Sequence, residues 1–291
     1  MKTSQKVEDF LTYLVTEKGD NITTIHCYQK DLSEFYEYLN DKEVENLTSD
    51  DMNDFLSHLS NKGMKNNTII RKSMAIKGFY KYLRMEGVIS VSLTDLVTPK
   101  KESRLPVTLS LEEVTKLLDQ PSRDTDKGLL DHTMILLCFS CGLRVSELVG
   151  LRIDRINHKN GFLRIFGKRN KERLVPISQG ALNAVSEYEI GYRKSIKTTN
   201  KNLFLHPDGS LVSRQYFFLE LKKYSKMAGI EKNVSPHTLR HTYATLLLEN
   251  GAKLRNIQEL LGHQDISTTQ IYTHISKKKQ VEEYHSAMPR K

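Results

Sequence analysis

Residues 235–274 concentrate side chains that could act together on a phosphate group: His237, Arg240, His263 and Tyr272. Ser235 and Pro236 suit the first turn of a helix, on which His237 and Arg240 would share a face because they are three residues apart. Glycines at positions 251 and 262, and a serine or threonine at 267 or 268, predict further helix boundaries. These boundaries would bring the four side chains within reach of one another.

Arg144 and Lys168 add two cations to this set. Arg144 lies in CGLRVSELVGL, at the glycine-marked end of an apolar helix, where an arginine needs a partner or a ligand. Glu147, three residues later, could orient Arg144 for a ligand or form a purely structural ion pair with it. Lys168 lies in the hairpin turn GKRNKER. Turn lysines are commonly just solvated, but a hairpin tip also suits a lysine that enters a DNA groove.

Phosphoryl transfer from DNA is the chemistry that two arginines, a lysine, two histidines and a tyrosine could perform together. One guanidinium group can bind two non-bridging phosphate oxygens at once, and it stays charged. Such groups can stabilise the charge that builds on a pentacoordinate phosphorus, which a metal ion does in other enzymes. A tyrosine, with a free pKa of about 10, needs such a positive pocket or a base to become a nucleophile. A lysine with a lowered pKa could protonate the leaving 5′ oxygen.

Metal and redox chemistry have weaker support in the sequence. His237 and His241 have the spacing of a helical zinc site, but the glutamate of H-E-x-x-H is absent and no acidic cluster accompanies them. Cys138 and Cys141 form a C-x-x-C inside the apolar run MILLCFSCGL, which favours a buried helical pair over a zinc or redox site. Three cysteines make no disulfide framework. We therefore expect neither a metal nor a cofactor.

The distribution of charge is compatible with a polyanionic partner. The 291 residues carry a net charge of +9, but residues 1–60 hold 5 Lys/Arg against 13 Asp/Glu, whereas residues 61–100 hold 8 against 2. Basic surfaces of this kind attract nucleic acids, although a lysine-rich soluble protein explains the charge equally well.

No apolar run approaches the roughly 20 residues of a membrane span, and no signal peptide precedes the first helix. These features predict a cytoplasmic protein without a membrane partner.

The elements that must position these residues are mostly helices. Residues 1–97 show four amphipathic helical patterns, which predict a small helical domain, and residues 98–106, TPKKESRLP, read as a linker. Residues 107–291 form a second domain, opened by a capping box at Ser110 and Glu113. Short β-type segments near residues 152–156, at FLRIF and at KERLVPI, separated by turns, predict a three-stranded antiparallel meander. The expected fold is mainly α, with this small sheet in the second domain.

Two helices carry candidate DNA contacts. The fourth helix of the first domain has basic residues among its apolar ones, so one side could pack while the other meets phosphates; its candidates are Arg71, Lys72 and Lys77. A solvated basic face is the alternative, but the acidic helices that precede it favour DNA. In the second domain, Arg214 and Gln215 open the helical segment SRQYFFLELKKYSKMAGI, where a plain solvated helix start remains an equal alternative for Gln215.

The second domain resembles the catalytic domain of tyrosine site-specific recombinases, the phage-integrase family. The matching stretches, in the order and at the spacing typical of that family, are CGLRVSELVGL, GKRNKERLVPI, HTLRHTYATLLLENGA and LGHQDISTTQIYTH. The combination is highly specific and covers about residues 107–285. The resemblance implies that the scissile phosphate is bound by three of the candidate residues: Arg144, Arg240 and His263.

The same resemblance assigns the chemical steps. Lys168 would protonate the leaving oxygen, His237 would assist proton transfer, and Tyr272 would be the nucleophile that forms a 3′-phosphotyrosyl bond. A 5′-hydroxyl from another duplex would then rejoin the strands without ATP or a metal. The helical first domain resembles the core-binding, SAM-like domain of the family, which implies a C-shaped clamp on DNA. Implied partners are double-stranded DNA with two recombination sites and a tetramer, built from this chain alone or with a paralogue.

The tail KKKQVEEYHSAMPRK resembles that of the Xer-type subgroup, which resolves chromosome or plasmid dimers. In that family the last segment docks on a neighbouring protomer, for which Val281, Tyr284 and Met288 are the candidate apolar contacts here; a frayed basic tail is the alternative. The early start of the first helix also leaves no room for the arm-binding domain of many phage integrases. Alternatives are a mobile-element integrase, a relaxing type IB-like topoisomerase, or a DNA-binding regulator with a dead catalytic domain. The complete set of six residues argues against the regulator.

Overall fold

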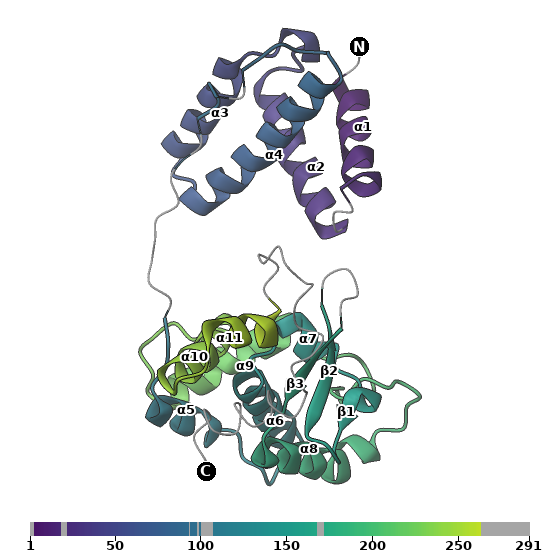
Figure 1. Ribbon diagram of the computed structural model, residues 1–291, viewed down its shortest axis with the longest axis vertical. Coiled ribbons are helices and arrows are strands. Elements are labelled where there is room, and N and C mark those ends of the chain that lie inside the picture. Colours follow the sequence, from purple (N-terminus) through teal and green to yellow (C-terminus); the bar gives the residue numbers. More distant parts are fainter. Residues whose placement is uncertain are drawn as a thin grey trace. The chain divides into compact units, whose positions relative to one another are not determined.

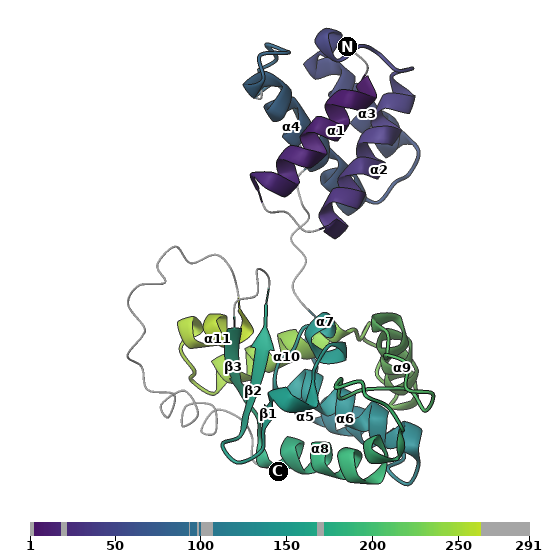
Figure 2. The same ribbon diagram turned by 90° about the vertical axis from the view of Figure 1, so that its right-hand side faces the viewer.

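The chain divides into two compact units, residues 1–104 and residues 105–291. The computed structural model describes residues 3–18, 22–92, 94–97, 99, 107–167 and 172–262. Helices dominate both units, and one small antiparallel sheet lies in the second, so the predicted mainly α fold is confirmed (Figures 1 and 2). No helix in the described part of the chain combines the length and apolar character that a membrane crossing requires.

The first unit consists of the four helices that the sequence predicts. They are α1 (Thr3–Thr16), α2 (Ile22–Tyr38), α3 (Ser49–Asn61) and α4 (Asn66–Met85), with a 3₁₀ turn at Val44–Asn46 between α2 and α3. Helix α4 contacts the other three. Their apolar stripes meet in a core rich in aromatic rings, among them Phe10, Phe35, Phe79 and Tyr80.

Lys72 is buried, which corrects the prediction that it lies on a basic face open to DNA. Its side chain is only 3% exposed, and its Nζ donates to Asp31 Oδ1 at 3.1 Å and to Glu34 Oε2 at 2.6 Å. Arg71, which is more exposed, also pairs with Asp31. The acidic side chains of α2 face α4 across the packed interface. Lys72 can stay charged in this buried position because these side chains pair with it. Lys77 is half-buried and stays a candidate contact.

Replacing Lys72 with methionine should lower the free energy of unfolding by about 2 kcal/mol, because buried Asp31 keeps only Arg71 as a charged partner. Urea unfolding of the variant measures this change. Lys81→Met is the matched control, since Lys81 lies exposed on the same helix and should change stability little. Reduced DNA affinity in a Lys72→Met protein of unchanged stability would contradict the structural role.

The second unit is built around α6 (Asp126–Ser140), which contacts α5 (Leu111–Leu118), α7 (Val145–Val149), α8 (Gln179–Gly191), α9 (Arg214–Met227) and α10 (Pro236–Glu249). The apolar sequence of α6 explains this central place, because a helix that is hydrophobic nearly all round must be covered on most sides. Cys138 and Cys141 are buried, as predicted, and burial raises the pKa of each thiol to about 12. Neither thiol is a thiolate at neutral pH.

The sheet is the predicted antiparallel meander, in the order β1 (Ile156–Asn157), β2 (Phe162–Phe166) and β3 (Glu172–Pro176). Leu163 pairs with Val175, and both side chains point into the core. The first strand is shorter than expected, because Ile153–Arg155 forms a 3₁₀ turn and only two residues reach the ladder. Lys168, in the connection between β2 and β3, lies outside the described residues.

Candidate active site

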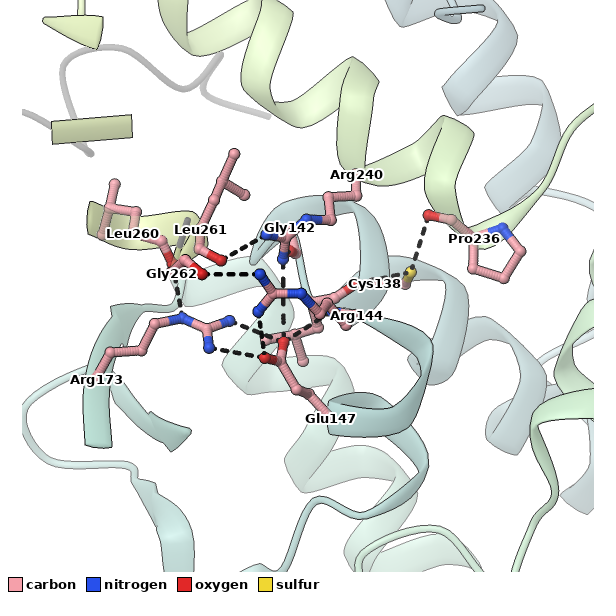
Figure 3. Close-up of polar contacts among 11 residues, drawn as sticks. Cys138, Gly142, Arg144, Glu147, Arg173, Pro236, Arg240, Leu260, Leu261 and Gly262 are labelled. Carbon is pink, nitrogen blue, oxygen red and sulfur yellow. Dashed lines mark hydrogen bonds and ion pairs between the residues drawn. The ribbon is translucent and has the colours of Figure 1, made fainter. Parts of the chain in front are cut away.

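Three arginines from separate elements converge on the carboxylate of Glu147 (Figure 3). Arg144 comes from the start of α7, Arg173 from β3 and Arg240 from α10. The carboxylate accepts hydrogen bonds from Arg144 Nη1 at 2.9 Å and from Arg173 Nη1 and Nη2 at 2.7 and 2.8 Å. Arg240 Nη1 lies 4.0 Å from Glu147 Oε2. The side chains of Glu147, Arg240 and Arg173 are 5%, 8% and 12% exposed, whereas that of Arg144 is 36% exposed, so the network meets solvent mainly at Arg144.

The sequence CGLRVSEL places Arg144 and Glu147 by local rules. Gly142 follows α6 with φ +57°, and a Cβ there would lie 2.5 Å from the Tyr243 ring, so both the backbone angle and the close approach require glycine. Arg144 then caps α7, and its backbone N–H donates to Glu147 Oε2 at 2.8 Å. Glu147 thus accepts from the Arg144 backbone N–H, which has no partner within the helix, and also from the Arg144 guanidinium group.

Helix α10 begins as predicted, with Ser235 as its cap and Pro236 in its first turn. It carries exposed His237 and, three residues later, Arg240, whose side chain is 8% exposed. Arg240 Nη1 donates to the Gly142 carbonyl at 2.6 Å. One helix therefore presents a histidine towards solvent and an arginine towards the interior of the site.

The last carbonyls of α11 (Leu254–Leu261) are each bound by a different arginine. Arg173 Nε donates to the Leu260 carbonyl at 2.8 Å, Arg240 Nη2 to Leu261, and Arg144 Nη2 to Gly262 at 2.8 Å (Figure 3). Carbonyls at the end of a helix lack partners within the helix and carry partial negative charge, which suits cations. Gly262, at φ +64°, ends the helix as the sequence predicts. The chain therefore leaves α11 towards residue 263 from a point that the arginines hold.

The cluster carries more positive than negative charge, because three guanidinium groups share one carboxylate. Burial and the neighbouring guanidinium groups lower the pKa of Arg240 to about 10, so it still carries its charge at neutral pH. Burial alone would raise the pKa of Glu147, but bonds from Arg173 and Arg144 outweigh it and hold that pKa below its ordinary value. A buried excess of positive charge is suited to an anionic ligand such as a phosphate diester.

The structure brings together part of the predicted site. Arg144 and Arg240 meet at Glu147, and His237 lies one turn from Arg240. The positions of Lys168, His263 and Tyr272 are outside the described residues. In the described part of the chain, no group of three or more His, Cys, Asp or Glu residues is arranged to hold a metal ion.

Arg173 is a site residue that the sequence analysis missed. In KERLVPI it lies two residues before Val175, so a strand places both on one face of the sheet. Val175 is buried, and Arg173 pairs across the ladder with buried Ile165. The period-two pattern of the strand was therefore the signal that Arg173 points inward and needs a partner.

The DNA-contact candidates of α9 are exposed at its first turn. Arg214 and Gln215 directly follow the cap Ser213, whose hydroxyl accepts from the Tyr216 backbone N–H at 3.0 Å. The Tyr216 hydroxyl donates to buried Asp131 at 2.8 Å, which anchors this turn to α6. The arrangement presents two polar side chains from a fixed helix start, compatible with either a DNA contact or a solvated turn.

Comparisons with known proteins cover nearly the whole chain. Residues 107–279 match the phage integrase family, and residues 7–87 match the N-terminal SAM-like domain of phage integrases. The chain is 43% identical over 289 residues to a tyrosine recombinase XerD of Lacticaseibacillus casei, and 38% identical over 290 residues to one of Staphylococcus epidermidis, with 98% of each chain covered. A solved structure of the XerH site-specific recombinase, bound to a palindromic difH substrate after cleavage, matches with a TM-score of 0.72. That match has 26% identity and covers 97% of this chain and 88% of the other. The chain is a tyrosine recombinase and belongs to the phage integrase family.

Proposed function

We propose that this protein is a Xer-type recombinase that cleaves and rejoins duplex DNA at two sites and so resolves chromosome or plasmid dimers. The observation that carries the proposal is the cluster of three guanidinium groups around the buried carboxylate of Glu147. The names of its full-length relatives, tyrosine recombinases XerD, support the Xer assignment. The XerH structure, solved with a difH DNA substrate after cleavage, supports DNA as the substrate.

Arg144 and Arg240 would bind the non-bridging oxygens of the scissile phosphate. A guanidinium group has five N–H donors, and each of these arginines directs two nitrogens to described protein acceptors. The remaining donors can meet a phosphate while Glu147 and the carbonyls keep the groups in place. Negative charge grows on the non-bridging oxygens in the transition state, and donors that the fold holds in place stabilise it without reorganisation.

Tyr272 would attack the phosphorus through its phenolic oxygen. One P–O bond forms to tyrosine, the P–O bond to the 5′ oxygen breaks, and Lys168 supplies the proton that the leaving oxygen takes. His263 would bind the phosphate with the arginines, and His237 would assist proton transfer by accepting the phenolic proton that Tyr272 loses. A 5′-hydroxyl of the second duplex then reverses these steps, so the ester conserves the bond energy and no ATP is consumed.

The DNA would be gripped by both units and by more than one protomer. Arg214 and Gln215 in the second unit, and Arg71 and Lys77 in the first, are the proposed contacts; most such contacts reach phosphates and carry no sequence information. A tetramer on two duplexes, of this chain alone or with a paralogue, would exchange the strands. The tail from Val281 to Met288 would link the protomers, and the reaction would take place in the cytoplasm.

Recovery and sequencing of DNA covalently attached to the wild-type protein in its own cells tests the proposal, with Tyr272→Phe as the matched control. Tyrosine-dependent adducts at one near-palindromic chromosomal locus are the expected result. Adducts at the ends of a mobile element would make the protein an integrase. Scattered adducts without a shared sequence would make it a topoisomerase. Protein that binds DNA without forming tyrosine-dependent adducts would be a regulator, and adducts that persist in Tyr272→Phe would overturn the proposed nucleophile.

A further inference from the structure

Helix α11 is attached to the rest of its unit by few apolar contacts. Tyr243 and Leu247 of α10 pack with Ile257, Leu260 and Leu261 of α11 in a cluster separate from the main core of the unit. Besides α10, helix α11 contacts β3, and the two lie side by side in Figure 2. Because its apolar anchorage is small, the position of the end of α11 depends strongly on the polar bonds made to its carbonyls.

Arg173 makes the polar bond that ties this helix end to the sheet. Its Nε donates to the Leu260 carbonyl at 2.8 Å, while its Nη1 and Nη2 donate to the two carboxylate oxygens of Glu147. The side chain is 12% exposed. All three nitrogens of the guanidinium group are therefore engaged by protein acceptors. The backbone of Arg173 lies in β3, and Val175 of the same strand belongs to the main core.

We infer that Arg173 is a positioning residue of the cleavage site. It holds the Glu147 carboxylate in the orientation that Arg144 needs, and it fixes the end of α11, from which the chain continues to His263 and Tyr272. Arg173 acts through these groups and does not itself bind the scissile phosphate. The inference rests on the proposed function. It makes Arg173, a residue of β3, responsible for the positions of groups that α7 and α11 contribute to the site.

Removal of the Arg173 guanidinium should leave a full-length protein whose phosphate-binding groups are misplaced. Glu147 would keep its bonds from Arg144 but lose the bidentate pair that sets its plane, and the Leu260 carbonyl would lose its partner. A displacement of the order of 1 Å at a reacting centre costs about 10²-fold in rate. Lysine would restore charge but not three donors in a fixed fork, so Arg173→Lys should recover little of the loss.

Arg193 offers a matched control in the same unit. It is also a buried arginine, 7% exposed, and its guanidinium binds two backbone carbonyls, at Asn202 with 3.1 Å and at Asn200 with 2.5 Å. Arg173→Ala and Arg193→Ala therefore both remove a largely buried, carbonyl-bound arginine, but of the two only Arg173 bonds to Glu147 and to the end of α11. A purely structural role of Arg173 predicts the same behaviour for the two variants.

The test measures single-turnover cleavage of a nicked duplex that traps the covalent adduct. The duplex carries the DNA sequence that is recovered from wild-type adducts. We expect cleavage by folded Arg173→Ala to be about 10²-fold slower at saturating protein, with DNA affinity unchanged. Cleavage by Arg193→Ala should match wild type after correction for the folded fraction. Millimolar guanidinium chloride, but not equal sodium chloride, should rescue Arg173→Ala by binding Glu147. Wild-type rates in Arg173→Ala, or equal losses in both variants, would overturn the inference.

A second readout needs no substrate and separates this inference from the proposed function. Amide hydrogen exchange in DNA-free protein should be faster across residues 254–262 in Arg173→Ala than in Arg193→Ala, because the end of α11 has lost its tie to β3. Unchanged exchange there would overturn the positioning role, even if wild type cleaves DNA. If wild type forms no tyrosine adduct on any DNA, the proposed function fails, and Arg173 then holds α11 without serving cleavage.

Discussion

Replacing Arg240 with methionine is expected to slow single-turnover DNA cleavage by about 10²–10³-fold, the usual loss when one donor to a developing charge is removed. Methionine cannot neutralise a phosphate, and it leaves the Gly142 and Leu261 carbonyls without their donor. The free energy of unfolding should fall only slightly. The lost hydrogen bonds, worth about 1 kcal/mol each, are opposed by relief of the burial that lowers the pKa of Arg240 to about 10.

The measurement pairs cleavage rates with urea unfolding of the same preparations. Arg193→Met is the control, because it too removes two carbonyl-bound donors from a buried arginine, and it should lose stability while cleavage stays normal. The cluster would have no role in catalysis if Arg240→Met cleaved DNA at the wild-type rate. A variant that unfolds with a loss larger than that of Arg193→Met would show that Arg240 serves mainly to hold the fold together.

Replacing Glu147 with glutamine should lower the free energy of unfolding by about 3–5 kcal/mol, the cost of breaking a buried ion pair by removing one partner. Glutamine has nearly the same shape, but it leaves Arg144, Arg173 and Arg240 close together without a counter-charge. Glu113→Gln is the matched control, because Glu113 also accepts a bond at a helix start and pairs with Lys232, but in a more exposed setting. We expect that control to lose less than 1 kcal/mol, as is usual for exposed pairs.

The pH dependence of the Glu147→Gln effect follows from the lowered pKa of the carboxylate. Burial opposes ionisation, but the bonds from Arg173 and Arg144 hold the folded pKa below the ordinary value of 4.5. A lowered folded pKa adds stability that is fully present above about pH 4.5 and is lost as the pH falls through the folded pKa. The difference between wild type and Glu147→Gln should thus be constant near neutrality and narrow in acid. A difference that widened in acid would contradict the ion-pair account.

Much of the framework of the site was predictable because it depends on neighbours in the sequence. The cap at Ser235 and the left-handed stop at Gly262 involve residues a few positions apart, and both formed as expected. The meander followed from alternation and turn spacing, although the first strand is shortened by the turn at Ile153–Arg155. The bond between Arg144 and Glu147 spans three residues and was therefore visible as an option in the sequence.

The sequence could not say which charges are buried, because that depends on what faces them. Lys72 belongs to a basic helix by composition, but Asp31 and Glu34, about 40 residues earlier, face it from α2 and bury it as an ion pair. Arg173 was not singled out in the sequence, although it too is a cation whose partners lie far away in the chain. Its partners are Glu147, 26 residues earlier, and Leu260, 87 residues later.

By itself, the sequence determined the helical units, several of their caps and the residue types of the candidate site. Those features arise from short-range hydrogen bonds and periodic burial, which the local order of residues controls. Only the tertiary structure decided that one carboxylate is shared by three arginines, and that the same arginines bind three successive carbonyls at the end of α11. Contacts such as that of Arg240 with Gly142, 98 residues apart, require the whole unit to pack, because chain order alone sets no distance between such residues.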